Sequence, residues 1–356
     1  MEEKIRNFLK RIFPAIVIAV VGIILTGGSS IDLTGMLFSG FWAGDVTITL
    51  LGLLIASVPV HFGWAVLIRE TARRTDRGWY CILLLVLAFA ILDTAVLSQS
   101  WFSREESGSG VQSLLAVVLR SSYRGLSLWS ILPSIVTQMF EFSVSIALAE
   151  ALFPARRGPW FSKRELCTLG AFVTISFTAI IALELKREID LDHVLVISWL
   201  QSATATIVMI ATIVAAFRTP TLNVCPAYRK PLSPVLCGVV SFLAVCLYKL
   251  LFAFLWLIHW SIAGRLICTG FEVSLMIGMV GFVLRESAQR EWNEMHRLSL
   301  AAGAALAYSL AGFLYRPHGV SLAIHLSANL IFALATVALI VLARRRTAEF
   351  LRSEVV

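Results

Sequence analysis

Residues 234–260 read PVLCGVVSFLAVCLYKLLFAFLWLIHW, an almost wholly apolar stretch. It is longer than the ~20 residues that a helix needs to cross a bilayer. Lys249 lies 15 residues after Pro234 and 11 residues before Trp260, so roughly 22 Å and 16 Å of helix separate it from the two ends. A lysine side chain does not cover that distance to the headgroups. The stretch therefore predicts a membrane-spanning helix with an internal charge, at a cost of about 2.5–3.5 kcal/mol unless a partner compensates it.

The composition extends this prediction to the whole chain, because 58% of the 356 residues are hydrophobic and only 15% are charged. A soluble domain has about 25% charged residues, and a β-barrel would show short alternating segments instead of long apolar ones. We expect an all-α fold, a polytopic transmembrane helical bundle that forms a single membrane domain over residues 1–356. The ten predicted spans are about 12–27, 46–68, 79–100, 126–153, 166–185, 193–217, 234–258, 264–284, 298–315 and 320–343.

The distribution of basic residues between these spans predicts their orientation. With the N-terminus inside, the cytoplasmic segments hold 22 of the 30 Lys and Arg residues and the external segments hold 7. Such a bias is the signature of cytoplasmic loops. The sequence thus predicts a multi-pass protein of the cell (cytoplasmic) membrane with both termini in the cytoplasm. The net charge of +8 is accounted for by these loops, so no nucleic-acid partner is expected. The apolar piece 111–119 is too short to span and is predicted to be interfacial or re-entrant.

Glu272 is the candidate partner of Lys249 in the predicted topology. It lies in the next span, and a hairpin that turns near residues 260–261 would place Lys249 and Glu272 at equal distances from the turn. The two side chains would then lie at one depth, where an ion pair would offset the cost of burying each charge. Whether they pair is left open by the sequence.

Other polar residues are predicted to lie near the same depth, in the outer half of the membrane. Measured from the outer ends of the spans at helical rise, the depths are about 12 Å for Asp93, 14 Å for Asn329, 16 Å for Lys249 and Glu272, and 8 Å for His325. Glu141 lies deeper, with Gln138 one turn above it. Buried ionisable groups in membranes indicate a functional site by default, although a purely structural charge network is the alternative. The candidate substrate-binding or charge-network residues are Lys249, Glu272, Asp93, His325, Asn329, Gln201 and Glu141.

Two of the spans carry patterns that predict faces packed against protein. Span six has a polar stripe at i, i+3, i+4 and i+7, and span nine has small residues at four-residue spacing, which allow backbones to approach closely. The polar stripe either forms hydrogen bonds between helices or lines a binding site. The residues are Ser198, Gln201, Ser202 and Ala205 in the stripe, and Gly303, Ala307 and Ala311 in span nine, with Gly278 and Gly281 of span eight expected to pack likewise.

Sequence signatures of soluble enzymes and metal sites are absent. The chain has no GxSxG, no GxxxxGK[ST] and no Rossmann glycine run in context. His61 begins HFGWA, which lacks both the Glu and the second His of a zinc-protease helix. We therefore predict no metal site and no cofactor.

Two stretches resemble known groups of membrane proteins. Residues of about 60–160, which include RRTDRGWYCILLLVLAFAILDTAVLSQSWF and IALAEALFPARRGPW, resemble a group of bacterial multi-pass membrane proteins in which an acidic pair is expected where this chain has Asp93 and Thr94. The motif of His325 and Asn329, HLSAN, resembles the HxxxN motif of the CAAX-protease and bacteriocin-processing family of intramembrane proteases. The Glu-Glu pair followed by Arg and the FxxxH motif of that family do not occur in a predicted span.

Three functions remain open on these observations, and the sequence leaves undecided whether the protein is an enzyme. The first is a transporter or permease that handles a lipid or small molecule at the polar layer. The second, implied by the protease resemblance, is an intramembrane hydrolase in which Asp93 or Glu272 activates water and His325 and Asn329 stabilise the oxyanion. The third is a non-catalytic membrane subunit or receptor. The expected partners are the lipid bilayer, a lipid or small-molecule substrate, and other membrane subunits.

Overall fold

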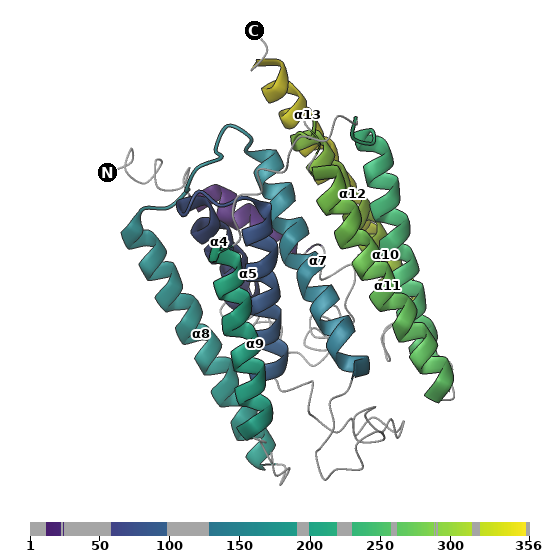
Figure 1. The fold of residues 1–356 in the computed structure, drawn as a ribbon. Coiled ribbons are helices and arrows are strands. Elements are labelled where there is room, and N and C mark those ends of the chain that lie inside the picture. The colour runs from purple at the N-terminus through teal and green to yellow at the C-terminus, as the bar shows by residue number, and fades with distance from the viewer. Residues whose placement is uncertain are drawn as a thin grey trace. The chain divides into compact units, whose positions relative to one another are not determined.

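The computed structural model of the chain describes residues 12–22, 24, 58–97, 128–190, 199–218, 230–257, 262–287, 289, 291–314 and 321–353. The regular elements in these ranges are helices, as the composition predicts. They are a helix at Ile12–Gly22, α4 (Val58–Arg74), α5 (Trp79–Ile91), the π-helix η2 (Leu92–Leu97), α7 (Leu128–Leu152), α8 (Lys163–Asp190), α9 (Trp199–Arg218), α10 (Pro234–Leu257), α11 (Ile262–Ser287), α12 (Glu294–Ala311) and α13 (Leu322–Ser353) (Figure 1).

Three of these helices contain segments that are long and apolar enough to cross a membrane, at Ile135–Leu152, Pro234–Leu251 and Leu322–Ser353. Shorter apolar helices lie at Ile12–Gly22, Trp79–Ala95 and Ala203–Arg218. These segments support a membrane protein, while the number of ten spans and the cytoplasmic termini remain predictions. The predicted segment 111–119 and the first part of the predicted span 46–68 lie outside the described residues.

The chain divides into two compact units. The first contains Met1–Asp76, Glu141–Ser176 and Leu222–Val356, and the second contains Arg77–Phe140 and Phe177–Thr221. Because α7 and α8 each run from one unit into the other, the sequence of a single span is divided between the units. Each unit is described below by itself.

In the first unit, α10 and α12 are packed with their backbones close together. A Cβ built on Gly303 would lie 2.1 Å from the carbonyl oxygen of Gly238, which is far inside van der Waals contact. Ser241 Oγ donates a hydrogen bond of 2.8 Å to the carbonyl oxygen of Leu300 across the same interface. The predicted packing face of span nine is confirmed at Gly303 and at Ala307, which is buried.

The prediction that the glycines of α11 form a similar face is wrong. A Cβ on Gly278 or Gly281 would meet nothing within 4 Å, and both residues are exposed. Small residues at helical spacing permit close approach but do not require it, since a lipid-facing helix tolerates them equally well.

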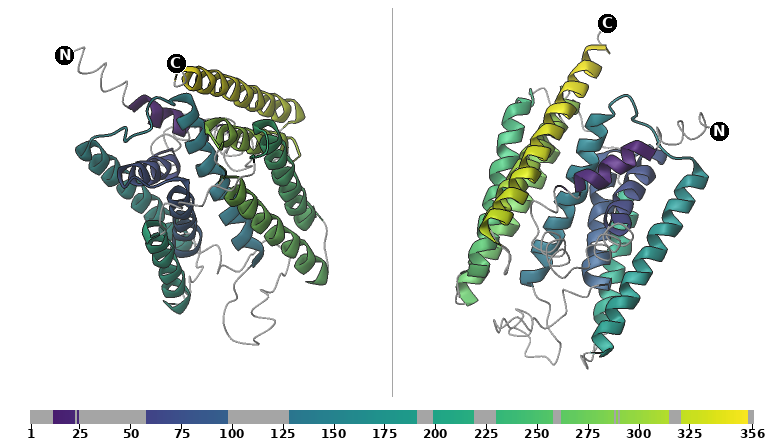
Figure 2. Two further views of the ribbon diagram at one scale, coloured as in Figure 1. Left: turned by 45° about the horizontal axis from the view of Figure 1, so that its top comes forward. Right: turned by 180° about the vertical axis from the view of Figure 1, so that it is seen from behind.

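Helix α13 packs beside α12 in the same unit, as the two views of Figure 2 show. Ser309 Oγ donates to Thr336 Oγ1 at 3.0 Å, and both side chains are buried. The helix continues to Ser353, ten residues beyond the predicted end of span ten at residue 343. Figure 1 shows this C-terminal part of α13 extending past the ends of α11 and α12.

In the second unit, α5 and η2 pack against α9. Ile91, Ala95 and Ala205 form a buried cluster, with Leu87 and Met209 packed against it. The prediction that the stripe of span six faces protein is thus confirmed at Ala205. Ser198 lies outside the described residues, and the side chains of Gln201 and Ser202 are not among those described.

Candidate functional site

Lys249 lies in the C-terminal half of α10, within a segment that is long and apolar enough to cross a membrane. Its Nζ lies 4.2 Å from the ring centroid of Tyr308 on α12 and 6.0 Å from that of Tyr248. A cation over an aromatic face at this distance is attracted by the ring quadrupole, by about 0.5–2 kcal/mol. Among the described residues, Lys249 Nζ has no hydrogen bond and no ion pair within 4.0 Å, so its three N–H donors are unused by them.

The charge that acts on Lys249 is the carboxylate of Glu141 on α7, and not that of Glu272. Glu141 is buried, and both residues belong to the first unit. The hairpin geometry considered for the sequence placed Glu272 opposite Lys249, yet no ion pair joins these two described residues. The hairpin itself exists, since α10 and α11 pack together. Equal depth on two helices does not fix which faces of the helices meet, and that is why the partner differs.

Glu272 is a buried carboxyl group without a described partner. The residue is only 4% exposed, and its Oε1 has no hydrogen bond in the described part of the chain. A buried oxygen left without a donor costs about 1–3 kcal/mol. The Lys249 region is defined here as Lys249, Tyr308 and Glu141, and Glu272 is a separate buried polar group on α11.

Asp93 lies in the first turn of the π-helix η2, in the second unit. Gln138 Nε2 donates a hydrogen bond of 2.7 Å to Asp93 Oδ2. Gln138 is on α7, one turn before Glu141, so α7 contributes a polar group to each unit. Single π-turns occur frequently at functional sites, and nothing in the residue pattern of LDTAVL would distinguish this turn from an α-helix.

His325 and Asn329 lie one turn apart on α13, and both are buried. Asn329 Nδ2 lies 3.2 Å from His325 Nδ1 and donates to the His325 carbonyl oxygen at 2.9 Å. Within the described ranges, the His325 ring has no hydrogen bond to a carboxylate. The two residues of the HxxxN motif therefore contact each other along their own helix, and the oxyanion-stabilising role that the resemblance implies stays a prediction.

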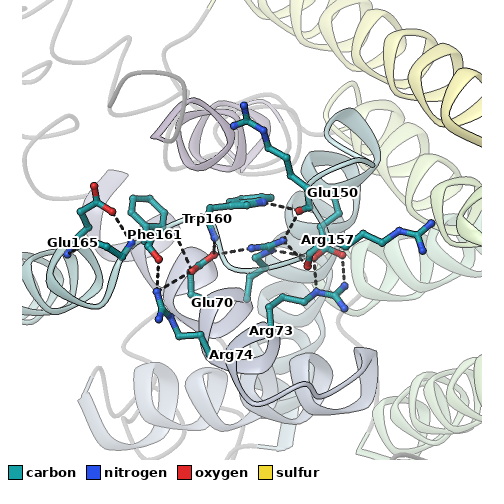
Figure 3. Close-up of polar contacts among 11 residues, drawn as sticks. Glu70, Arg73, Arg74, Glu150, Arg157, Trp160, Phe161 and Glu165 are labelled. Atoms are coloured by element: carbon teal, nitrogen blue, oxygen red, sulfur yellow. Dashed lines mark hydrogen bonds and ion pairs between the residues drawn. The ribbon is translucent and has the colours of Figure 1, made fainter. Parts of the chain in front are cut away.

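A second polar cluster lies at the C-terminal ends of α4 and α7, and the sequence interpretation did not single it out. Arg69 and Glu70 are both 0% exposed. Arg69 Nη1 donates to Glu70 Oε1 at 2.7 Å, and Arg69 Nε donates to Glu150 Oε1 at 3.0 Å. The guanidinium also lies 3.6 Å from the ring centroid of Trp160. Figure 3 shows the two carboxylates lying among the arginines of α4. We call Arg69, Glu70, Arg73, Arg74, Glu150 and Trp160 the arginine cluster.

The other residues of the arginine cluster are also bound, although Arg74 Nε is buried without a hydrogen-bond partner in the described part of the chain. Arg73 donates two hydrogen bonds to Glu150, from Nε to Oε1 at 2.8 Å and from Nη2 to Oε2 at 2.6 Å. The backbone N–H groups of Trp160 and Phe161 donate to Glu70 at 2.9 Å and 3.3 Å. Arg74 donates to the carbonyl oxygen of Phe161. This bidentate pairing and the backbone bonds connect α4, α7 and the segment between α7 and α8.

The charges of the cluster are tuned by burial and by their partners. Burial lowers the pKa of Arg69, and the carboxylates of Glu150 and Glu70 oppose that effect. Burial acts in the same direction on Arg73, but the hydrogen bond and charge of Glu150 outweigh it and raise the pKa of that guanidinium. Arginine stays protonated at neutral pH in either case. The arrangement is that of a fixed ion network, which holds helices in place.

The sequence contained one signal for this cluster. The arginines of RETARR, residues 69–74, belong to a cytoplasmic segment in the predicted topology. In the structure Glu150 binds Arg69 and Arg73. An acidic residue beside the first of three closely spaced arginines at a helix end indicates such a network, but counting positive charges cannot reveal it.

Neither protein-family models, nor curated proteins, nor solved structures give a match to this chain. The interpretation of the site consequently rests on its geometry. Among the described residues, no group of three or more His, Cys, Asp or Glu side chains could hold a metal ion.

Proposed function

We propose that the protein is a multi-pass protein of the cytoplasmic membrane that binds and moves a polar lipid or small molecule at the Lys249 region. The observation that carries the proposal is the state of Lys249. Its ammonium lies inside an apolar helix that is long enough to cross a membrane, and it lies against the ring of Tyr308 with no hydrogen bond from its Nζ to the described residues.

A charged side chain that serves only the structure would have all its hydrogen-bonding groups paired, because a buried charge without partners is destabilising. Arg69 is saturated, whereas Lys249 is balanced by a ring and by the charge of Glu141 without direct hydrogen bonds. The three N–H donors of Lys249 suit an anionic or carbonyl group of a substrate. A lipid headgroup or a small molecule with an anionic group fits this arrangement.

A screen of ligand-induced thermal stabilisation tests the proposal. The purified protein is mixed with anionic, zwitterionic and cationic metabolites and short-chain lipids, and the unfolding temperature is recorded. We expect anionic or zwitterionic compounds to stabilise the wild type and to lose on the order of tenfold or more in affinity for Lys249→Met, as removal of a charged hydrogen-bond donor predicts.

Lys230→Met provides the matched control, because Lys230 is an exposed lysine outside the helices. It should bind the same compounds as the wild type. Equal affinity of Lys249→Met and the wild type for every stabilising compound would contradict a binding role for Lys249.

A further inference from the structure

We propose that the C-terminal turns of α13 form a binding site for the headgroup of an anionic phospholipid whose acyl chains lie along the same helix. The site consists of Arg344, Arg345 and Arg352, which are exposed and make no hydrogen bond or ion pair to the described residues. It is separate from the Lys249 region and does not depend on the function proposed above.

The length of α13 puts these arginines at the level of the headgroups. The helix is 32 residues long, or about 48 Å, whereas the hydrocarbon core of a bilayer is about 30 Å thick. Residues 322–342 are enough to cross it. The arginines begin two residues after Leu342 and lie within the next three turns.

The arginines continue the lipid-facing side of the helix. Leu334, Val337 and Val341 are 61%, 45% and 44% exposed. At about 100° per residue, Leu334, Val341, Arg345 and Arg352 lie within about 40° of one another around the helix axis. One face of α13 is therefore apolar through the membrane and basic beyond it. An anionic phospholipid is complementary to this face, because its acyl chains match the apolar part and its phosphate matches the basic part.

The opposite side of these turns is fixed to the first unit, so the arginines are held in place. Arg346 Nη1 donates to the carbonyl oxygen of Leu152 at 3.1 Å, and Thr347 Oγ1 donates to that of Ala151 at 3.1 Å. Arg157 lies 4.9 Å from the ring centroid of Phe350. Glu349 is the one acidic residue between 344 and 352, against four arginines. Basic clusters directly after a membrane-spanning helix attract anionic lipids by about 1 kcal/mol per residue.

A second copy of this chain fits the face less well than a lipid does. Two copies that met along the apolar part of α13 in parallel would bring their arginines together, and like charges in contact repel. An anionic lipid neutralises the same charges. The chemistry thus favours a phosphate-bearing lipid as the occupant.

Native mass spectrometry of the detergent-solubilised protein tests the site with phosphatidylglycerol, phosphatidylcholine and inorganic phosphate as probes. We expect the wild type to retain phosphatidylglycerol in preference to phosphatidylcholine. The triple variant R344Q/R345Q/R352Q should lose on the order of 100-fold in affinity for phosphatidylglycerol at low salt. The control K163Q/R164Q/R285Q removes three exposed charges from other helix ends and should lose less than about threefold.

Several results would overturn the proposal. They are equal retention of phosphatidylglycerol by the triple variant and the wild type, equal retention of the two lipids by the wild type, and displacement of the lipid by millimolar inorganic phosphate, which would assign the site to free phosphate. A wild-type dimer that survives removal of all lipid and is strengthened in the triple variant would assign the face to a second copy. If the triple variant does not fold, Arg345→Gln alone should show a loss of about fivefold.

Discussion

The arginine cluster and the Lys249 region both place cations inside the first unit, but they satisfy them differently. Arg69 is surrounded by two carboxylates, two backbone carbonyls and an indole ring. Lys249 has a phenol ring and a carboxylate that acts on it without a hydrogen bond. The nitrogen atoms of the Arg69 guanidinium are all hydrogen-bonded, so this group has no capacity left for a ligand. The ammonium of Lys249 keeps that capacity, and this difference separates a structural role from a binding role.

The largest effect is expected when the arginine cluster is broken. Arg69→Met leaves Glu70 and Glu150 without their shared buried cation, and loss of one partner from a buried pair costs about 3–5 kcal/mol. The free energy of unfolding, measured by denaturant titration in detergent micelles, should fall by this amount. Arg285→Met, which changes an exposed arginine, should change it by less than about 0.5 kcal/mol. A comparable small change in Arg69→Met would remove the structural role.

The close packing of α10 against α12, which places Tyr308 beside Lys249, should also be sensitive to substitution. Gly303→Ala places a Cβ 2.1 Å from the Gly238 carbonyl oxygen, so α10 and α12 must separate. Overpacking of this kind costs about 1–3 kcal/mol. Gly278→Ala is the matched control, because its Cβ meets open space, and alanine there should be neutral or stabilising by up to about 1 kcal/mol. Equal stabilities of the two variants would show that the close approach is not needed.

A smaller effect is expected at the polar contact of the second unit. Gln138→Leu removes the donor of the 2.7 Å hydrogen bond to Asp93, which should cost about 0.5–1.5 kcal/mol of unfolding free energy. Asp93→Asn keeps a hydrogen-bonding group at the position and should cost less. If Gln138→Leu is neutral while Asp93→Asn abolishes ligand binding, Asp93 belongs to the functional site in preference to the helix packing.

The smallest effect concerns the start of α12. His296 Nδ1 accepts from the backbone N–H of Asn293 in a capping box, and burial lowers the pKa of His296. Because the pKa of His296 in the folded protein lies below the ordinary value of 6.5, the neutral imidazole contributes its full stabilisation above about pH 6.5. The unfolding free energy should decline as the pH falls from there through the folded pKa. His296→Gln should remove this pH dependence, and a slope that persists in the variant would exclude His296 as its source.

Helix bounds were predictable where apolar length decides them. The predicted span 234–258 corresponds to α10 at Pro234–Leu257 and the span 264–284 to α11 at Ile262–Ser287. The end of α13 was not predictable, because the arginines at 344–346 are a stop signal for a membrane span and not for a helix. Tertiary contacts of Arg346 and Thr347 with the end of α7 accompany the continued helix.

Membership of the site was only partly predictable, since the sequence shows which residues are anomalous and not which of them meet. Lys249 was singled out because a charge in an apolar span is anomalous at any orientation. Its partner depends on which helix faces meet, and this is set by contacts between residues far apart in the sequence, such as that of Gly303 with Gly238. The same limit applies to Glu150, whose partners lie 77 and 81 residues away.

The most direct test of the contrast is a pair of double-mutant cycles measured by the same unfolding titration. The cycles are Arg69→Met with Glu150→Gln, and Lys249→Met with Glu141→Gln. Residues in one hydrogen-bonded network couple by about 0.5–3 kcal/mol. We expect a coupling energy of about 2–3 kcal/mol for Arg69 and Glu150, which are hydrogen-bonded, and a smaller one of about 0.5–1 kcal/mol for Lys249 and Glu141, which interact through charge alone. A coupling energy of Lys249 with Glu141 as large as that of Arg69 with Glu150 would make both pairs structural and contradict the assignment of Lys249 to a binding site.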